Sequence, residues 1–259
     1  MKTTFSPCIE WLFAEGGRAF PDRFRAAAMA GFQQVEFWAT TDKDVEALQR
    51  AASDNGISIT AFVSEPTGRL VDAATHADFL QGVRRSADLA ARLGARNLIV
   101  LSGDAMPGVD RRSQADAIVD ALQQAAPIAA ASGVRLLLEP LNTRVDHKGY
   151  FLDSTAEGLD VIRRVGHPAA RLLFDVYHAV VMGEDPATVL DGAGDLVGHV
   201  HIADVPGRHE PGTGGIDWPR QLAALRAAGY SGLLGLEYLP TRDTESSLAY
   251  IAGLPVDFC

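Results

Sequence analysis

Four side chains that can bind a cation or move a proton recur at regular intervals in the second half of the chain. Each lies at or near the end of a short apolar run, and neighbouring members are 36, 26 and 36 residues apart. This spacing is close to one strand–helix repeat per step, so the four are expected at equivalent points of consecutive repeats. The residues are Glu139, Asp175, His201 and Glu237.

Three carboxylates that converge on a partly buried site repel one another, and each is driven toward its protonated form unless a cation neutralises them. A divalent metal is the natural cation, because three carboxylates and one imidazole form a mainly hard ligand set. Such a set favours Mn²⁺ or Mg²⁺ and also accepts Co²⁺ or Zn²⁺. The alternative is that each residue merely ends a strand or pairs with an arginine, and the shared register of all four disfavours it.

Two further residues are candidates for contacts with a substrate. His178 follows Asp175 by three residues, which can bring its ring over the mouth of the site to bind a substrate oxygen. Arg208 lies in a glycine-containing segment, Asp204 to Trp218, and can supply a fork for a substrate carboxylate. The glycines of that segment, in Gly212 to Gly215, could instead expose backbone N–H groups to a phosphate or form a purely structural turn.

Two more ionisable residues have open roles. His199 precedes His201 by two residues, so a regular strand points both rings to the same side at different depths. His201 is the expected ligand because it lies nearer the end of its strand. The roles of His199, Glu36 and the Gly212 to Gly215 loop stay open at this point.

The elements that must position these residues alternate along the whole chain. Short apolar or β-branched runs are separated by longer stretches with apolar residues every three or four positions, which is the pattern of βα units and a parallel sheet. Strands are expected at Thr3 to Ser6, Gln34 to Phe37, Ser58 to Val63, Asn97 to Leu101, Arg135 to Glu139, Arg171 to Asp175, Gly198 to Ile202 and Leu233 to Glu237. Helices are expected at Asp44 to Asn55, Ala77 to Leu93, Gln114 to Ala131, Thr155 to Val165 and Trp218 to Ala228.

Eight such repeats of about 32 residues predict a (β/α)₈ TIM barrel that occupies residues 1–259 as a single domain. The alternative is an open, doubly wound sheet, but no GxGxxG follows the first strand, where a dinucleotide fold needs it. Glycines are expected to end the helices in the left-handed conformation. They are Gly31, Gly56, Gly94, Gly133, Gly166 and Gly229.

Composition limits the class of protein further. The 259 residues are 47% hydrophobic and carry a formal net charge of −10, which indicates a packed core and opposes binding to nucleic acid. The two cysteines, Cys8 and Cys259, form neither a disulfide framework nor a CxxC site, which favours a reducing compartment. With no signal peptide and no apolar run long enough to cross a bilayer, we expect a soluble, cytoplasmic protein.

Five motifs together resemble the hydroxypyruvate isomerases of the xylose isomerase-like TIM barrels. The resemblance implies metal ligands at Glu139, Asp175, His201 and Glu237, with the two glutamates as the acid/base pair, and substrate contacts at His178 and Arg208. The chain departs from that family at His201, where hydroxypyruvate isomerases tend to carry Gln and the related ketose 3-epimerases carry His. The third strand also lacks the expected His near its end. The motifs are Glu139 to Asn142, Phe174 to His178, Ile202 to Asp204 with Arg208, Glu210 to Gly214, and Gly235 to Tyr238.

The leading functional hypothesis is metal-assisted isomerisation of a small hydroxy-carbonyl compound, of the hydroxypyruvate to tartronate semialdehyde type, through an enediolate. A metal polarises the carbonyl, and one glutamate removes a proton while the other returns one to the adjacent carbon. The alternatives are a ketose 3-epimerase, a metal-dependent nuclease, which the acidic charge disfavours, and a barrel that binds a sugar or a partner protein without turnover. A homo-oligomer is also open, because Tyr177 and Val180 to Met182 form either an interface or the underside of a helix.

Overall fold

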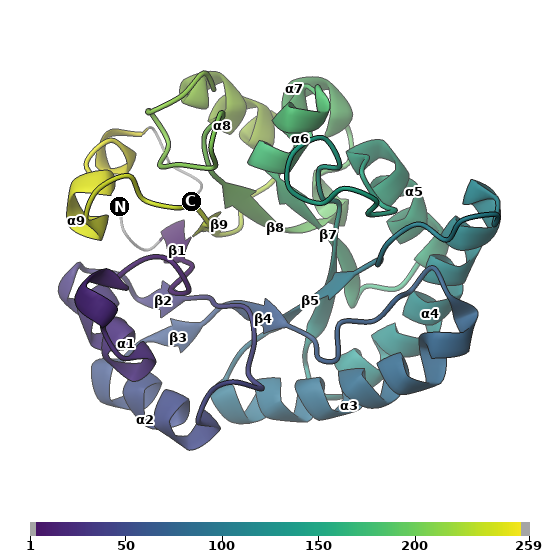
Figure 1. Cartoon of the computed structure of the whole chain (residues 1–259), viewed down its shortest axis with the longest axis horizontal. Helices are drawn as coiled ribbons and strands as arrows, with labels where there is room; N and C mark the ends of the chain where they lie inside the picture. Colours follow the sequence, from purple (N-terminus) through teal and green to yellow (C-terminus); the bar gives the residue numbers. More distant parts are fainter. Residues whose placement is uncertain (1–3, 255–259) are drawn as a thin grey trace.

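The computed structural model describes residues 4–254, in which parallel strands form a central barrel and helices surround it (Figure 1). Thr3, the expected start of the first strand, lies outside the described residues. Seven strands form one sheet in the order β1-β9-β8-β7-β6-β5-β4, and β2 pairs with β3. The strands are β1 (Phe5–Pro7), β2 (Gln34–Val35), β3 (Ser58–Ile59), β4 (Ala61–Val63), β5 (Asn97–Leu101), β6 (Arg135–Glu139), β7 (Ala170–Asp175), β8 (Val197–Ile202) and β9 (Leu234–Leu236).

The segment that begins with β2 closes the barrel between the two ends of the larger sheet. On one side the backbone N–H of Glu36 donates to Pro7 O at 3.0 Å, and on the other the N–H of Val63 donates to Trp38 O at 2.8 Å. The predicted TIM barrel is therefore confirmed.

One expected strand, Ser58 to Val63, is divided at Thr60 into β3 and β4. The Thr60 carbonyl accepts a hydrogen bond from the Asn97 side-chain amide at 2.9 Å, and its hydroxyl accepts one from Ser6 Oγ at 2.9 Å. The division coincides with a change of partner, since β3 pairs with β2 and β4 pairs with β5.

The helices pack around the outside of the barrel, and the five expected ones agree with the structure within three residues at either end. Asp44, Asp110 and Ser154 cap the first turns of α2, α4 and α5 with their side-chain oxygens. All six glycines expected beyond helix ends have a positive φ. The helices are α1 (Phe20–Met29), α2 (Val45–Asn55), α3 (His76–Leu93), α4 (Arg111–Ala131), α5 (Thr155–Val165), α6 (Val176–Met182), α7 (Pro186–Val189), α8 (Trp218–Ala227) and α9 (Thr244–Ser247).

The barrel interior is arranged in layers, because every second residue of a strand faces the same side. One layer contains an apolar cluster, Ala61, Ile99, Leu137 and Leu173, from β4 to β7. Two positions further along β6 and β7, the same face carries Glu139 and Asp175. An apolar floor therefore lies directly below the acidic side chains.

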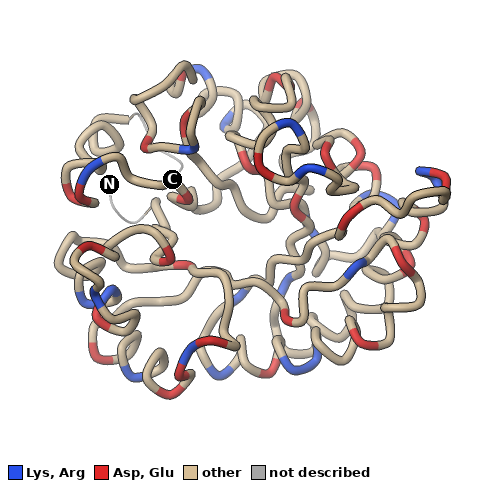
Figure 2. Tube along the Cα trace, viewed as in Figure 1, with Lys and Arg blue, Asp and Glu red and all other residues tan. Residues whose placement is uncertain are grey.

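Along the Cα trace, Lys and Arg positions and Asp and Glu positions are both distributed over the outer helices and loops (Figure 2). Tyr177 is buried, and Val180 and Val181 pack partly buried against the core, so this face of α6 is largely the underside of a helix. Among the described residues, none of the helices has the length and apolarity required to cross a membrane.

Candidate active site

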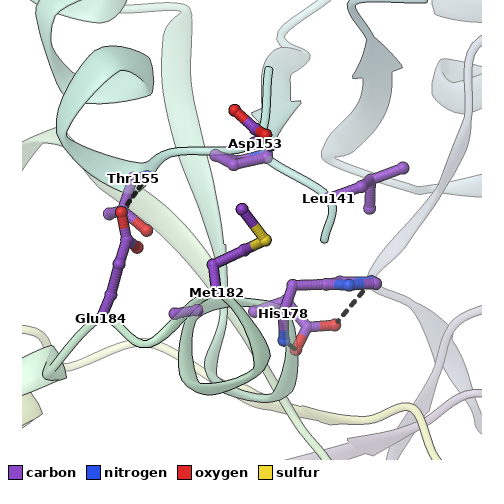
Figure 3. Close-up of a pocket in the computed structure, with 9 residues that line it drawn as sticks. Leu141, Asp153, Thr155, His178, Met182 and Glu184 are labelled. Carbon is purple, nitrogen blue, oxygen red and sulfur yellow. Dashed lines mark hydrogen bonds and ion pairs between the residues drawn. The ribbon is translucent and has the colours of Figure 1, made fainter. Parts of the chain in front are cut away.

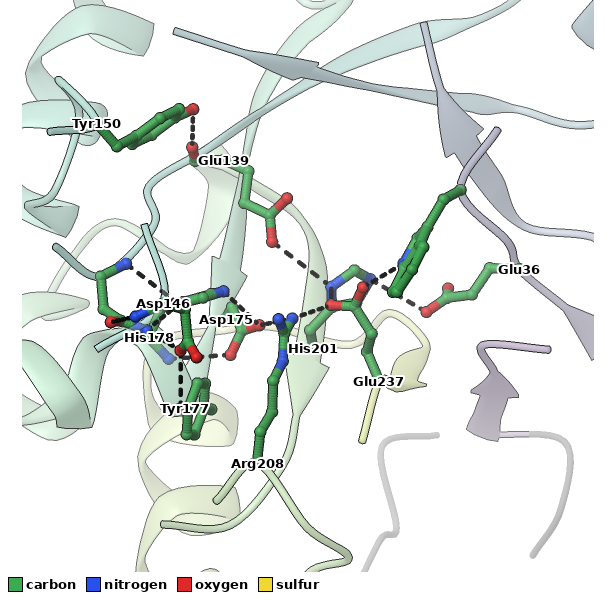
Figure 4. A network of polar contacts seen from close by, with 12 residues as sticks. Glu36, Glu139, Asp146, Tyr150, Asp175, Tyr177, His178, His201, Arg208 and Glu237 are labelled. Atoms are coloured by element: carbon green, nitrogen blue, oxygen red, sulfur yellow. Dashed lines mark hydrogen bonds and ion pairs between the residues drawn. The ribbon is translucent and has the colours of Figure 1, made fainter. Parts of the chain in front are cut away.

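The four residues singled out by their spacing meet at the carboxyl ends of neighbouring strands. Glu139 and Asp175 end β6 and β7, His201 lies near the end of β8, and Glu237 directly follows β9. One potential ligand atom from each lies within 4.8 Å of those of the other three, and all four side chains are buried (Figure 4). The sequence therefore predicted correctly that these residues form one cluster.

This cluster has the chemistry of a cation site. Nδ1 of His201 lies 3.0 Å from Glu237 Oε2 and 3.7 Å from Glu139 Oε1. Within residues 4–254, neither this ring nitrogen nor Glu139 Oε1 has a hydrogen-bond partner, although both atoms are buried. Orphaned buried donors and acceptors are costly, and a divalent cation would satisfy both at once. The residues therefore fit a hard divalent metal such as Mg²⁺ or Mn²⁺.

Burial and neighbouring charges shift the pKa values of Glu139 and Glu237 in opposite directions. Burial raises the pKa of Glu139 above its ordinary value, and the charges of Glu237 and Asp175 add to this effect. Burial also acts to raise the pKa of Glu237, but Arg208 and His201 outweigh it and lower that pKa. Without a bound cation, the site thus holds one carboxyl that favours its proton and one that favours its charge.

His178 lies in the first turn of α6. Asp175 caps this helix, and its Oδ1 accepts from the His178 backbone N–H at 3.2 Å. Nδ1 of the ring accepts from the backbone N–H of Asn142 at 3.1 Å and lies 2.7 Å from its side-chain Nδ2. Because Nδ1 accepts, the ring proton resides on Nε2, which is buried and has no hydrogen-bond partner in the described part of the chain. His178 is among the residues that line the cavity, and its Nε2 lies 3.6 Å from Asp175 Oδ2.

His178 is held in place by a hydrogen-bonded network of Asn142, Asp146 and Tyr177, called the polar bracket below. Asn142 Nδ2 donates to Asp146 Oδ2 at 2.7 Å, and the Tyr177 hydroxyl donates to the same oxygen at 2.8 Å. The bracket joins the loop after β6 to the first turn of α6 (Figure 4). Sequence reasoning did not identify Asn142, Asp146 or Tyr177 as part of the site, although Asn142 and Tyr177 lie within motifs that also contain Glu139 and His178.

Arg208 reaches into the centre of the site. Its Nη2 lies 2.5 Å from Glu237 Oε2 and 3.4 Å from Asp175 Oδ2. The guanidinium also lies 5.3 Å from the Trp11 ring centroid and 5.5 Å from that of Tyr177. Its backbone has a φ of 57°, a left-handed conformation that is uncommon outside glycine and that often accompanies functional positions.

The segment from Asp204 to Trp218 positions Arg208. Several backbone N–H groups of this segment point toward the Asp204 carboxylate. The buried Asp204 carboxylate accepts from the N–H groups of Val205, Gly212 and Ile216 and from the Trp218 indole. A Cβ on Gly214 would overlap Asp204 Oδ1 and the Val205 carbonyl. These contacts favour a structural role for the glycines over phosphate binding.

A cavity of about 560 Å³ opens above the cluster. Glu139, Glu237, His178 and Arg208 contribute to its lining, together with Asp146 and His147. Its remaining wall is mainly apolar and includes Trp11, Trp38, Val63, Leu101, Leu141 and Leu239.

Trp38 links this wall to the cluster, because its indole Nε1 donates to Glu237 Oε1 at 2.6 Å. Trp11 packs edge-on against Trp38 with ring centroids 4.9 Å apart. The two tryptophans were missed from the sequence, although both closely follow the ends of expected strands, where barrel active sites form.

A second, much smaller cavity of about 10 Å³ lies behind Asp175 and His178 (Figure 3). Leu141, Asp153, Thr155, Met182 and Glu184 also contribute to its wall. This volume corresponds to about one water molecule and is too small for a substrate.

The chain resembles known proteins over nearly its whole length. A family model described as xylose isomerase-like TIM barrel matches residues 24–254. The 2-oxo-tetronate isomerase of Cupriavidus necator is 34% identical over 242 residues, which cover 90% of this chain and 92% of that protein. The hydroxypyruvate isomerase of Escherichia coli is 30% identical over 254 residues, which cover 95% and 97%. The crystal structure of AP endonuclease, family 2, from Brucella melitensis has a TM-score of 0.89 and 32% identity, and covers 97% and 98% of the two chains.

Proposed function

The chain belongs to the hydroxypyruvate isomerase family of the xylose isomerase-like TIM barrels, and we propose that it is a metal-dependent isomerase of small hydroxy-carbonyl acids. The observation that carries the proposal is the buried cluster Glu139, Asp175, His201 and Glu237 at the floor of a cavity that Arg208 enters. Substrates of the hydroxypyruvate and 2-oxo-tetronate type fit this arrangement, since relatives of this chain are isomerases named for both compounds.

The four clustered residues would hold one divalent cation, Mg²⁺ or Mn²⁺ in the first place. When bound, the cation would polarise the substrate carbonyl and stabilise the negative charge that develops as the neighbouring C–H proton leaves. Glu139 and Glu237 both border the cavity, so one carboxylate can remove that proton while the other returns a proton to the adjacent carbon. As the proton of the neighbouring hydroxyl passes to the former carbonyl oxygen, the carbonyl moves by one carbon, with no net change in the composition of the substrate.

Two donors orient the substrate in this proposal. His178 presents its Nε2–H to a substrate oxygen, and the Asn142 contacts keep the other ring nitrogen from taking that role. Arg208 provides the cation for a substrate carboxylate while it steadies Glu237. The apolar wall around Trp11 and Trp38 excludes water from the reacting atoms.

A second candidate is epimerisation at C3 of a ketose, and His201 favours it because ketose 3-epimerases carry His at this position. Both reactions begin with the same proton removal, but epimerisation leaves the carbonyl where it was. Proton NMR in D₂O with hydroxypyruvate, 2-oxo-tetronate and a panel of ketoses distinguishes them. A product in which the carbonyl has not moved and the configuration of the adjacent carbon is inverted would refute the isomerase and support the epimerase.

A nuclease and a binding protein without turnover fit the site less well. A nuclease would have to bind a polyanion, whereas Glu65, Glu139, Asp146 and Glu237 give this cavity an acidic lining. A binding protein without turnover has no need of two glutamates beside a cation. It would show substrate binding by calorimetry without any exchange of substrate protons.

The proposal is tested with Glu139→Gln and Glu237→Gln, which preserve side-chain shape but remove the proton-transfer group. Each is expected to lower kcat by on the order of 10²- to 10⁴-fold. Glu46→Gln, an exposed change on α2, serves as the matched control and should retain wild-type turnover. Chelation should abolish activity, and Mn²⁺ or Mg²⁺ should restore it. Full activity of chelated, metal-free enzyme would exclude the proposed mechanism.

A further inference from the structure

Glu36 is a buried carboxylate that lies next to the metal cluster without belonging to it. It directly follows β2, its side chain is almost completely inaccessible, and its relative exposure is 2%. It reaches His201 from the side away from Asp175 and His178 (Figure 4). A buried carboxylate is costly unless polar partners compensate it, so its contacts point to its role.

Both oxygens of Glu36 face imidazole nitrogens. Oε2 lies 2.8 Å from Nε2 of His199, in a hydrogen bond, and Oε1 lies 3.1 Å from Nε2 of His201. His199 therefore holds a carboxylate whose second oxygen is directed at His201.

The two nitrogens of His201 thus face different partners. Nδ1 faces the cluster, 3.0 Å from Glu237 Oε2, whereas Nε2 faces Glu36. A neutral imidazole binds a cation only through the nitrogen that lacks the proton, so Nδ1 can be a ligand only if the proton is on Nε2. Glu36 Oε1 lies 3.1 Å from Nε2, and within residues 4–254 both atoms are buried without an aligned hydrogen-bond partner. A small rotation of the ring would therefore let Oε1 accept the Nε2 proton in a hydrogen bond.

Gly235 supplies the space that this arrangement needs. A Cβ at this position of β9 would overlap Glu36 Oε1, the His201 ring and His199 Nε2. The rings of His199 and His201 pack edge to face with centroids 5.0 Å apart. Three strands, β2, β8 and β9, therefore combine to build the contact between Glu36 and the two histidines.

We infer that Glu36 is a positioning residue, which fixes the Nε2–H tautomer of His201 and directs its Nδ1 lone pair at the metal cluster. The inference rests on the proposed function, because it assigns to His201 the role of a metal ligand. Carboxylate partners of ligand histidines act in this way by orienting the ring and raising its basicity. Glu36, His199 and His201 could alternatively bind a second cation among themselves, and the stoichiometry of binding separates the two possibilities.

The test measures Mn²⁺ binding to chelator-stripped protein by titration calorimetry. Wild type is expected to bind one Mn²⁺ per chain, and Glu36→Gln to bind it roughly 10- to 100-fold more weakly. Glu36→Asp keeps the charge and should recover part of the affinity. Glu15→Gln, which removes a carboxylate bonded to Thr244 instead, is the matched control and should bind like wild type. If Glu36→Gln does not fold, the comparison rests on Glu36→Asp, which should then bind Mn²⁺ more weakly than wild type.

A second readout reports the tautomer itself. In ¹⁵N-histidine-labelled, Mg²⁺-bound protein, the His201 signals should have the Nε2–H pattern, and His201→Gln identifies them by their loss. Equal Mn²⁺ affinity and an unchanged tautomer in Glu36→Gln would overturn the inference while leaving the proposed function intact. Binding of two Mn²⁺ per chain would overturn it in favour of a second cation site. Wild type that binds no Mn²⁺ would refute the proposed function, and this inference with it.

Discussion

Replacing His178 by Gln is expected to flatten the pH dependence of the stability of the metal-free protein. Burial lowers the pKa of His178 from 6.5 to about 4, against the opposing charge of Asp175. The unfolded chain takes up a proton near pH 6.5, whereas the folded protein does so only near pH 4. The contribution of His178 to the free energy of unfolding is therefore fully present above the pKa of the ring in the unfolded chain. It is lost as the pH falls toward the pKa of the ring in the folded protein.

The two pKa values set the size of the effect. The full difference corresponds to about 3 kcal/mol, and the part lost between about pH 7.5 and about pH 5 is about 2 kcal/mol. Gln at this position has no titrating proton but keeps an oxygen that can accept from Asn142. The change therefore removes the pH dependence of this group with limited damage to the bracket around it.

Urea unfolding at the two pH values, in the presence of EDTA, measures the free energy of unfolding of wild type and variant. Other groups titrate in the same range, so the decisive quantity is the difference between the two proteins in how much stability each loses. The wild type should lose about 2 kcal/mol more than the variant. Equal losses would show that His178 is not held neutral by burial, and would refute the reasoning about its ring nitrogens as well.

Four further outcomes are expected. Arg208→Lys should lower kcat/KM roughly 10- to 100-fold in steady-state assays, because the single ammonium group of Lys cannot replace a guanidinium that contacts both the substrate and Glu237. Trp38→Phe should lower kcat about 10-fold with little change in Tm, since it removes only the indole donor to Glu237. Asp204→Asn should reduce the free energy of unfolding by about 1–3 kcal/mol and raise KM, because it weakens the loop that carries Arg208. Mn²⁺ at about 100 times its Kd should stabilise wild type by about 2.7 kcal/mol in thermal unfolding, and this gain should be absent in Glu237→Gln.

The barrel and the cluster of three acidic residues and one histidine were predictable because strong local signals coincide with the tertiary arrangement. The apolar runs that end in Glu139 and Asp175 are strands buried on both faces, and parallel strands bring their carboxyl ends to one edge. His201 was distinguished correctly from His199 as the residue nearer that edge, since His199 lies one layer deeper against Glu36.

The rest of the site depends on contacts between residues far apart in the chain. Trp38 donates to Glu237 across 199 residues, and Glu36 pairs with His199 across 163. No local pattern marks such pairs, because the loops after the strands decide which side chains meet. The helix that carries His178 was not predicted for a related reason: α6 begins directly after β7, and seven residues carry too short a periodic signal.

The cavity is built by two stretches of sequence with different tasks. The clustered acidic and histidine side chains lie between residues 139 and 237, whereas Trp11, Trp38, Val63 and Glu65 form much of the opposite wall. Trp38 hydrogen-bonds to Glu237, and Trp11 lies against the Arg208 guanidinium, so these two are tied to the cluster. Val63 and Glu65 have no such contact among the described residues, and changes at these two positions would alter the shape and charge of the cavity while the contacts of the cluster are preserved.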